Sequence, residues 1–131
     1  MRHLNMLAAG VASAAVVALA ISCGSTSSSS TAPSPGPASN TITISNNAVS
    51  PQNITVTRGT QVTFINSDSR VHDMDSDPHP EHTDCVELNQ VGFLNPGQSR
   101  QSGNLNTARR CGFHDHGNPD NKALQGTVTI Q

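Results

Sequence analysis

The sequence predicts an all-β domain over residues 41–131, preceded by an export signal over residues 1–22 and a disordered linker over residues 23–40. Three observations support this organisation. Polar and apolar residues alternate in several short stretches of the domain, which is the pattern of half-buried strands. No stretch keeps a helical period over its length. The linker contains small and polar residues without charge, and such a segment cannot bury a core.

The first 22 residues have the layout of a cleaved signal. A short basic start is followed by an uncharged apolar run over residues 7–21, which is too short for a bilayer span of about 20 residues. Small residues then lead to Cys23, as in a bacterial lipobox whose cysteine is acylated, although Ala20 stands where leucine is usual. We expect an exported lipoprotein attached through Cys23 to a membrane, in the periplasm or at the outer cell surface. The alternative is an ordinary secretory signal that happens to contain a cysteine.

Seven stretches of the domain are expected to form strands, separated by breaks such as Asn46-Asn47 and by turn signals such as Pro96-Gly97. Several short strands at this spacing predict a sandwich or a barrel. The domain has no Trp or Tyr, so we expect a small core of aliphatic residues with Phe64, Phe93 and Phe113, for which a cross-link or metal would add stability. The expected strands are residues 41–44, 53–57, 60–65, 71–74, 98–105, 107–113 and 126–130.

The charge balance and the motifs exclude several classes of function. The sequence has seven Lys and Arg and nine Asp and Glu, a formal net charge of −2. It therefore lacks the excess of basic residues that is typical of nucleic-acid-binding proteins. We expect no enzyme, because the short domain shows no plausible Ser/His/Asp set and no Cys-x-x-Cys pair.

Two clusters carry five of the six histidines. In the first, eight of the thirteen residues in 72–84 are His, Asp or Glu; the second is Cys111-Gly-Phe-His-Asp-His116. Imidazole and thiolate bind copper, zinc and similar ions, whereas the alternative is a solvated acidic loop with scattered histidines. Calcium is excluded because Pro78 stands where an EF-hand loop needs glycine. Zinc stays open, although the paired cysteine spacing of structural zinc sites is missing.

Several segments in order carry a family resemblance. Residues 53–66 look like paired early strands, Asp68 leads to His72, a Pro-Gly turn follows at residues 94–99, and a Cys-x-x-His motif precedes the final strand. Over residues 41–131 the chain resembles the cupredoxins, the plastocyanin-like blue copper proteins.

The resemblance implies an antiparallel two-sheet Greek-key β-sandwich with a mononuclear copper site at one end. His72, Cys111 and His114 would form the trigonal plane of that site. The family's axial methionine is missing, because no Met follows Met74. His116 is the nearest donor, and an imidazole there would draw the site away from the blue trigonal geometry.

Acids beside the predicted ligands are candidates to orient them. Asp73 and Asp115 would hold the imidazoles through hydrogen bonds, with plain surface acids as an equal alternative. His79 lies between two prolines in a predicted loop, so we expect it to matter less than His72 or His114.

The state of two cysteines separates two functions. With Cys111 as a copper thiolate, the protein would be a one-electron carrier. If Cys85 and Cys111 pair, as two thiols in an exported protein often do, the site is histidine-only and the protein binds or delivers copper without redox turnover. The bridge would add about 3 kcal/mol of stability.

Overall fold

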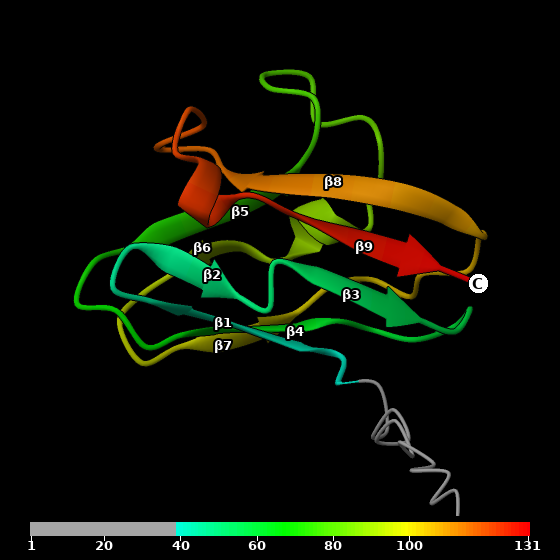
Figure 1. Ribbon diagram of the computed structural model, residues 1–131, viewed down its shortest axis with the longest axis horizontal. Helices are drawn as coiled ribbons and strands as arrows, with labels where there is room; N and C mark the ends of the chain where they lie inside the picture. The colour runs from blue at the N-terminus through cyan, green and yellow to red at the C-terminus, as the bar shows by residue number, and fades with distance from the viewer. Residues whose placement is uncertain (1–38) are drawn as a thin grey trace, which may run out of the picture. The chain divides into compact units, whose positions relative to one another are not determined.

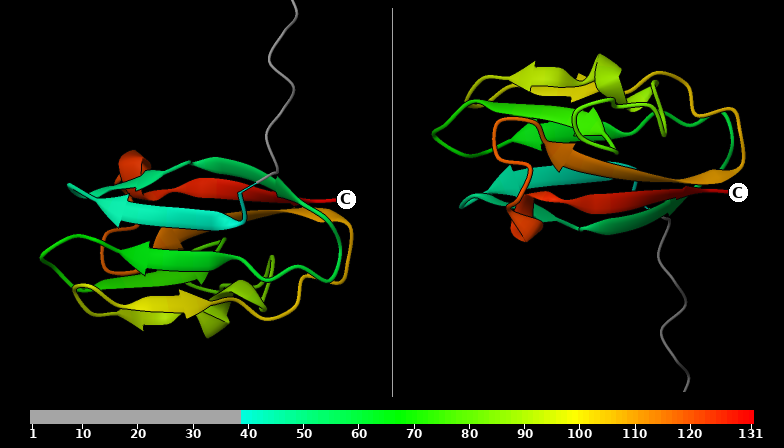
Figure 2. Two further views of the ribbon diagram at one scale, coloured as in Figure 1. Left: turned by 90° about the horizontal axis from the view of Figure 1, so that it is seen from below. Right: turned by 90° about the horizontal axis from the view of Figure 1, so that it is seen from above.

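The computed structural model describes residues 39–131, so the predicted signal, Cys23 and most of the linker lie outside the described part. Within residues 39–131, no helix has the length and apolar character needed to cross a bilayer. Two sheets pack face to face (Figure 1; Figure 2). The strands are β1 Thr41–Ser45, β2 Ala48–Ser50, β3 Asn53–Val56, β4 Thr63–Asn66, β5 His72–Ser76, β6 Gly92–Leu94, β7 Ser99–Gln101, β8 Arg109–Asp115 and β9 Gly126–Ile130, with short 3-10 segments η1 Leu88–Gln90 and η2 Lys122–Leu124.

The strand order confirms the predicted two-sheet β-sandwich. The first sheet runs β2-β1-β4-β7 and the second runs β3-β9-β8-β5-β6. The expectation of purely antiparallel pairing is wrong at two places, because β1 pairs with β4 and β3 pairs with β9 in parallel. Both parallel pairs join strands that are separated by other elements in the sequence. A parallel neighbour requires such a long crossover connection.

Two strands were missing from the sequence prediction. The expected break at Asn46 and Asn47 is instead the two-residue turn of a β1–β2 hairpin, with φ of 52° and 60°. Two successive residues with positive φ form the tight turn that suits the twist of a hairpin, and asparagine tolerates it. The other missing strand, β6, pairs with β5.

The core lies between the sheets and follows the alternation of the strands. Phe64 of β4 and Phe113 of β8 meet edge to face with ring centroids 5.2 Å apart, and so connect the two sheets. The expectation that Phe93 belongs to this core is wrong, because its side chain is 65% exposed. In β6 the next residue, Leu94, faces inward, and successive side chains of a strand point to opposite faces.

Side chains alternate in direction along β5 and β8. The histidines, acids and cysteine of these strands therefore lie on two different faces of the second sheet. Cys111, Phe113 and Asp115 are the buried residues on the inner side of β8, while the even-numbered positions alternate to the outer side. Asp75 of β5 lies opposite His114 of β8 in the register of the sheet. The chain between β5 and η1 rises over β8 (Figure 1) and covers this part of the outer face.

Candidate metal centre

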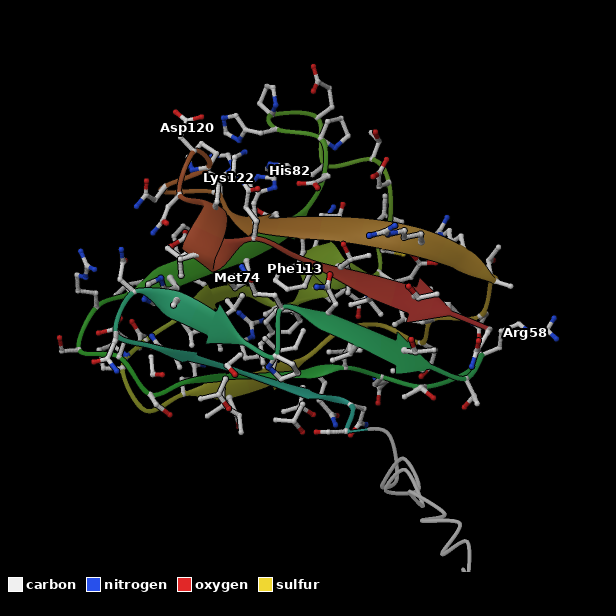
Figure 3. All side chains as sticks on the ribbon, in the orientation of Figure 1. Arg58, Met74, His82, Phe113, Asp120 and Lys122 are labelled. Carbon is white, nitrogen blue, oxygen red and sulfur yellow. A yellow bond between two sulfur atoms is a disulfide. The ribbon has the colours of Figure 1, made fainter. Side chains whose placement is uncertain are left out.

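Four histidines meet on the outer face of the second sheet. His79 and His82 come from the loop of residues 77–84, His114 comes from β8, and His116 follows that strand. One nitrogen from each lies within 4.8 Å of the others. Figure 3 shows His82 on the loop side of β8 and Phe113 on the side that faces the other sheet. We call this group the four-histidine cluster.

His114 is the most buried member of the cluster, with 2% of its surface exposed. Its Nδ1 lies 2.7 Å from Oδ1 of Asp77, so an N–H there donates to the carboxylate and leaves a lone pair on Nε2. That Nε2 is buried without a hydrogen-bond partner. A buried polar atom without a partner is costly. A metal ion bound to Nε2 would remove this cost.

Asp75 provides a second carboxylate beside the cluster. Its Oδ2 lies 3.6 Å from Nδ1 of His82 and 3.9 Å from Nδ1 of His116. Nε2 of His82 and Nδ1 of His116 face each other at 3.1 Å. Carboxylates that contact the imidazoles of a metal site orient the rings and raise their basicity.

Hydrogen bonds attach the loop to β8 and to η1 and fix its turn. The N–H of Asp77 donates to the carbonyl of Gly112 at 3.0 Å, and the N–H of His82 donates to the carbonyl of Pro78 at 2.7 Å. The side-chain amide of Asn89 donates to the carbonyl of His82 at 2.9 Å. A Cβ at Gly112 would lie 2.0 Å from Oδ2 of Asp77. Glycine between Cys111 and Phe113 therefore leaves the space that Asp77 occupies to reach His114.

Cys111 forms a disulfide with Cys85, with Cα atoms 5.7 Å apart. The expectation of a Cys111 thiolate ligand is therefore corrected, and the pairing left open by the sequence is the one in the structure. Cys111 points into the core beside Phe113, whereas His114 points to the outer face. Position and bonding both separate this sulfur from the four-histidine cluster.

His72 also lies apart from the cluster. It is buried at the start of β5, with Nδ1 2.7 Å from Oδ2 of Asp115 and Nε2 3.5 Å from Oδ2 of Asp68. Hydrogen bonds from the backbone N–H groups of Asn47 and Ser69 lower the pKa of Asp68. An ionised carboxylate therefore faces one side of the imidazole. His72, which the resemblance implies as the first copper ligand, therefore lies between two carboxylates.

Acidic residues surround the four-histidine cluster. No Lys or Arg occurs in residues 71–85 or 111–121. Burial raises the pKa of Asp73, and the charge of the neighbouring Asp75 raises it further. A surface region of one sign concentrates ions of the opposite sign. This region therefore attracts cations and repels anionic molecules.

A cavity of about 390 Å³ opens elsewhere, beside His72 and Asp115. The exposed side chains of Val71 and Phe93 line it, and none of the four clustered histidines does. We place the metal chemistry at the four-histidine cluster and not at this cavity, because four donors converge at the cluster. Nε2 of His72 is also buried without a hydrogen-bond partner, but it does not belong to this group of converging donors.

The comparisons with known proteins bear on the fold. No family model matches the chain, and no curated protein matches its sequence. Among solved structures, a purple cupredoxin from Nitrosopumilus maritimus has 22% identity and a TM-score of 0.56, covering 70% of this chain and 98% of that one. The chain has a cupredoxin-like fold.

Two further cupredoxin-like structures give the same result. Plastocyanin from Dryopteris crassirhizoma has 21% identity and a TM-score of 0.54, covering 70% of this chain and 99% of that one. A mutant of amicyanin in a Cu(I) structure has 17% identity and a TM-score of 0.54, covering 70% of this chain and 80% of that one. The resemblance seen in the sequence is confirmed at the level of the fold.

The predicted ligands of this cupredoxin-like domain divide into two pairs. The structure brings His114 and His116 together and leaves His72 and Cys111 elsewhere, and it adds His79 and His82. The carboxylates that contact the clustered imidazoles are those of Asp75 and Asp77, in place of the expected Asp73 and Asp115. One signal in the sequence pointed this way, since residues 73, 75 and 77 share one face of an extended strand and residues 112, 114 and 116 share another.

Proposed function

We propose that this protein binds one copper ion through imidazole nitrogens of His79, His82, His114 and His116. The observation that carries the proposal is the buried Nε2 of His114, which has no partner although three other imidazoles lie beside it. Imidazole suits copper and zinc. The fold adds support for copper, because the solved structures that share it include plastocyanin and Cu(I) amicyanin.

The donor set and its surroundings favour binding over catalysis. Copper, when bound, supplies a centre that can change between Cu(I) and Cu(II). The chain's own residues hold it: Asp77 fixes the orientation of His114, and Asp75 lies beside His82 and His116. The acids around the cluster draw cations toward the site and keep anionic substrates away. Copper capture or delivery, without enzymatic turnover, fits these features.

A titration of the purified protein with Cu²⁺ tests the proposal. We expect one ion per chain, nitrogen couplings in the electron paramagnetic resonance spectrum, and only a weak ligand-field band, because Cys111 is held in a disulfide. An intense thiolate-to-copper band would contradict the histidine-only site. So would an absence of binding.

A parallel titration with Zn²⁺ checks the choice of metal. Nitrogen sites bind Cu²⁺ more tightly than Zn²⁺ in the Irving–Williams order, so we expect copper to displace bound zinc. Zinc that resists displacement by equimolar copper would reassign the site to zinc.

One-electron transfer is the second candidate function. The observation that favours it is the partial exposure of His116, whose side chain is 44% exposed and gives the bound ion an imidazole edge at the surface. Voltammetry of the copper-loaded protein tests this candidate. A reversible one-electron wave supports electron transfer, and an irreversible wave with loss of copper leaves capture or delivery.

We also propose that the protein is exported and held at a membrane by a lipid on Cys23. The support is the signal-like start of the sequence, with small residues before Cys23 and an uncharged linker after it. Fractionation of cells that express the wild type or Cys23→Ala tests the anchor. We expect the wild type in the membrane fraction and the variant outside it. A wild type that is already in the soluble fraction would refute the lipid anchor.

A further inference from the structure

We propose that the Cys85–Cys111 disulfide assembles the four-histidine cluster, so that oxidation of the two thiols must precede tight metal binding. This inference rests on the proposed function of the cluster and adds a condition for it. It assigns a functional role to two cysteines that bind no metal themselves.

The loop and strand β8 each supply half of the ligands. His79 and His82 belong to the loop of residues 77–84, whereas His114 and His116 belong to β8 or follow it. Cys85 comes directly after the loop, and Cys111 lies on β8 three residues before His114. The disulfide is therefore a covalent link between the two segments that carry the ligands, and its cysteines lie close to those ligands in the sequence.

The start of the loop is held by weaker contacts. The backbone N–H of Asp77 donates to the carbonyl of Gly112, and the Asp77 carboxylate contacts His114. The Asp77 side chain is about half exposed, and exposed contacts of this kind contribute little against the entropy of a free loop. The disulfide fixes the opposite end, where the chain turns into the core at Cys85.

The burial of the disulfide indicates a condition for assembly, not a reversible switch. Both cysteines are 0% exposed, and a disulfide exchanges only when a thiolate reaches one of its sulfurs. Reduction therefore requires the domain to open. Formation is two-electron thiol–disulfide exchange: both thiols lose their protons and form the Cys85–Cys111 bond, while the oxidant, a disulfide of a partner molecule, is reduced to two thiols.

The expected effect follows from the population of the closed loop. Without the link the loop samples open conformations, and the apparent dissociation constant rises in inverse proportion to the closed fraction. A closed fraction of about 1–10% would weaken copper binding about 10- to 100-fold.

The test compares copper affinity in the wild type and in a Cys85→Ala/Cys111→Ala variant, which has no thiol at either position to bind or reduce copper. Cys23→Ala is the matched control, since it removes a cysteine outside residues 39–131. We expect the double variant to bind about 10- to 100-fold more weakly and the control to bind as the wild type does. Hydrogen exchange of the metal-free proteins should show the loop of residues 77–84 less protected in the double variant.

Each outcome decides a separate question. If the oxidised wild type binds no copper, the proposed function fails. If the wild type binds and the folded double variant binds equally well, only this inference is overturned. If the double variant is unfolded without metal, copper is added and circular dichroism is recorded. Recovery of the fold at wild-type copper concentrations overturns the inference, and absence of recovery supports it.

Discussion

The two faces of strand β8 carry different chemistry within four consecutive residues. On the inner face, Cys111 is bonded to Cys85 and Phe113 packs against Phe64. On the outer face, Gly112 makes room for the loop and His114 joins the cluster. The inner face stabilises the sandwich, and the outer face presents ligands.

The difference between the two faces explains why the cysteine and the histidine of the Cys-x-x-His motif do not share one metal site here. The spacing of three residues is odd, and successive side chains along a strand point to opposite faces. Because β8 continues through Asp115, Cys111 and His114 both lie inside the strand and point apart. A shared metal would require the strand to end before the histidine.

The largest expected effect on copper affinity comes from removing a histidine of the outer face, compared with removing one of the inner face. His114→Ala should weaken copper binding by more than about 100-fold, beyond the range typical for loss of an outer partner of a ligand. The matched inner-face variant His72→Ala should keep the copper affinity while losing about 2 kcal/mol of stability, because it breaks the buried hydrogen bond to the Asp115 carboxylate. Calorimetric titration and thermal unfolding measure both. A greater loss of affinity from His72→Ala would return the site to the inner face.

Asp77→Asn tests the carboxylate that orients His114. The amide keeps the size of the side chain but removes the charge, so copper affinity should fall by about 10-fold, at the low end for such partners. Glu81→Gln is the control, because it removes the same charge from an exposed position of the same loop. Equal losses in the two variants would mean that Asp77 acts only through general electrostatics.

Gly112→Ala tests the close approach of the loop to β8. The added methyl would collide with the Asp77 carboxylate, which must turn away from His114 but stays in the neighbourhood. We therefore expect a loss of affinity of about 3- to 10-fold, less than in Asp77→Asn. The double variant Gly112→Ala/Asp77→Asn should bind no more weakly than Asp77→Asn alone, since neighbouring sites that share one interaction are not additive. Additive losses would contradict the steric account.

The smallest effect concerns the acidity of the outer face. Burial raises the pKa of Asp73, so its ionisation disfavours the folded state at neutral pH. Asp73→Asn should raise the melting temperature of the metal-free protein by a few degrees at most at pH 7. The difference should vanish near pH 3, below the ordinary pKa of about 3.9, where the carboxyl is protonated in both states. Asp120→Asn, at an exposed turn, should leave the melting temperature unchanged at both pH values. A destabilised Asp73→Asn variant at pH 7 would contradict this account.

Much of the fold was predictable because its signals are local. The alternation in Thr41–Ile44 and Gly126–Ile130 reports half-buried strands wherever those strands lie, and both form β-strands in the structure. The hairpin at Asn46-Asn47 was missed because the same residues mark a loop or a tight turn, and only the partner strand distinguishes the two. The exposure of Phe93 was missed because hydrophobicity alone does not give the face of a short strand.

The sequence by itself determined that this is a small β-domain, that its histidines gather in two clusters, and that their ligand chemistry suits copper. Composition and short-range alternation carry that information. Which histidines share one site was decided by the tertiary structure, because it depends on the register of β5 against β8 and on the path of the loop between them. The same packing placed Cys85 next to Cys111 in the core and left His79, His82, His114 and His116 together outside it. Pairing across the sheet joins residues that are far apart in the sequence, and no local pattern predicts which residues pair.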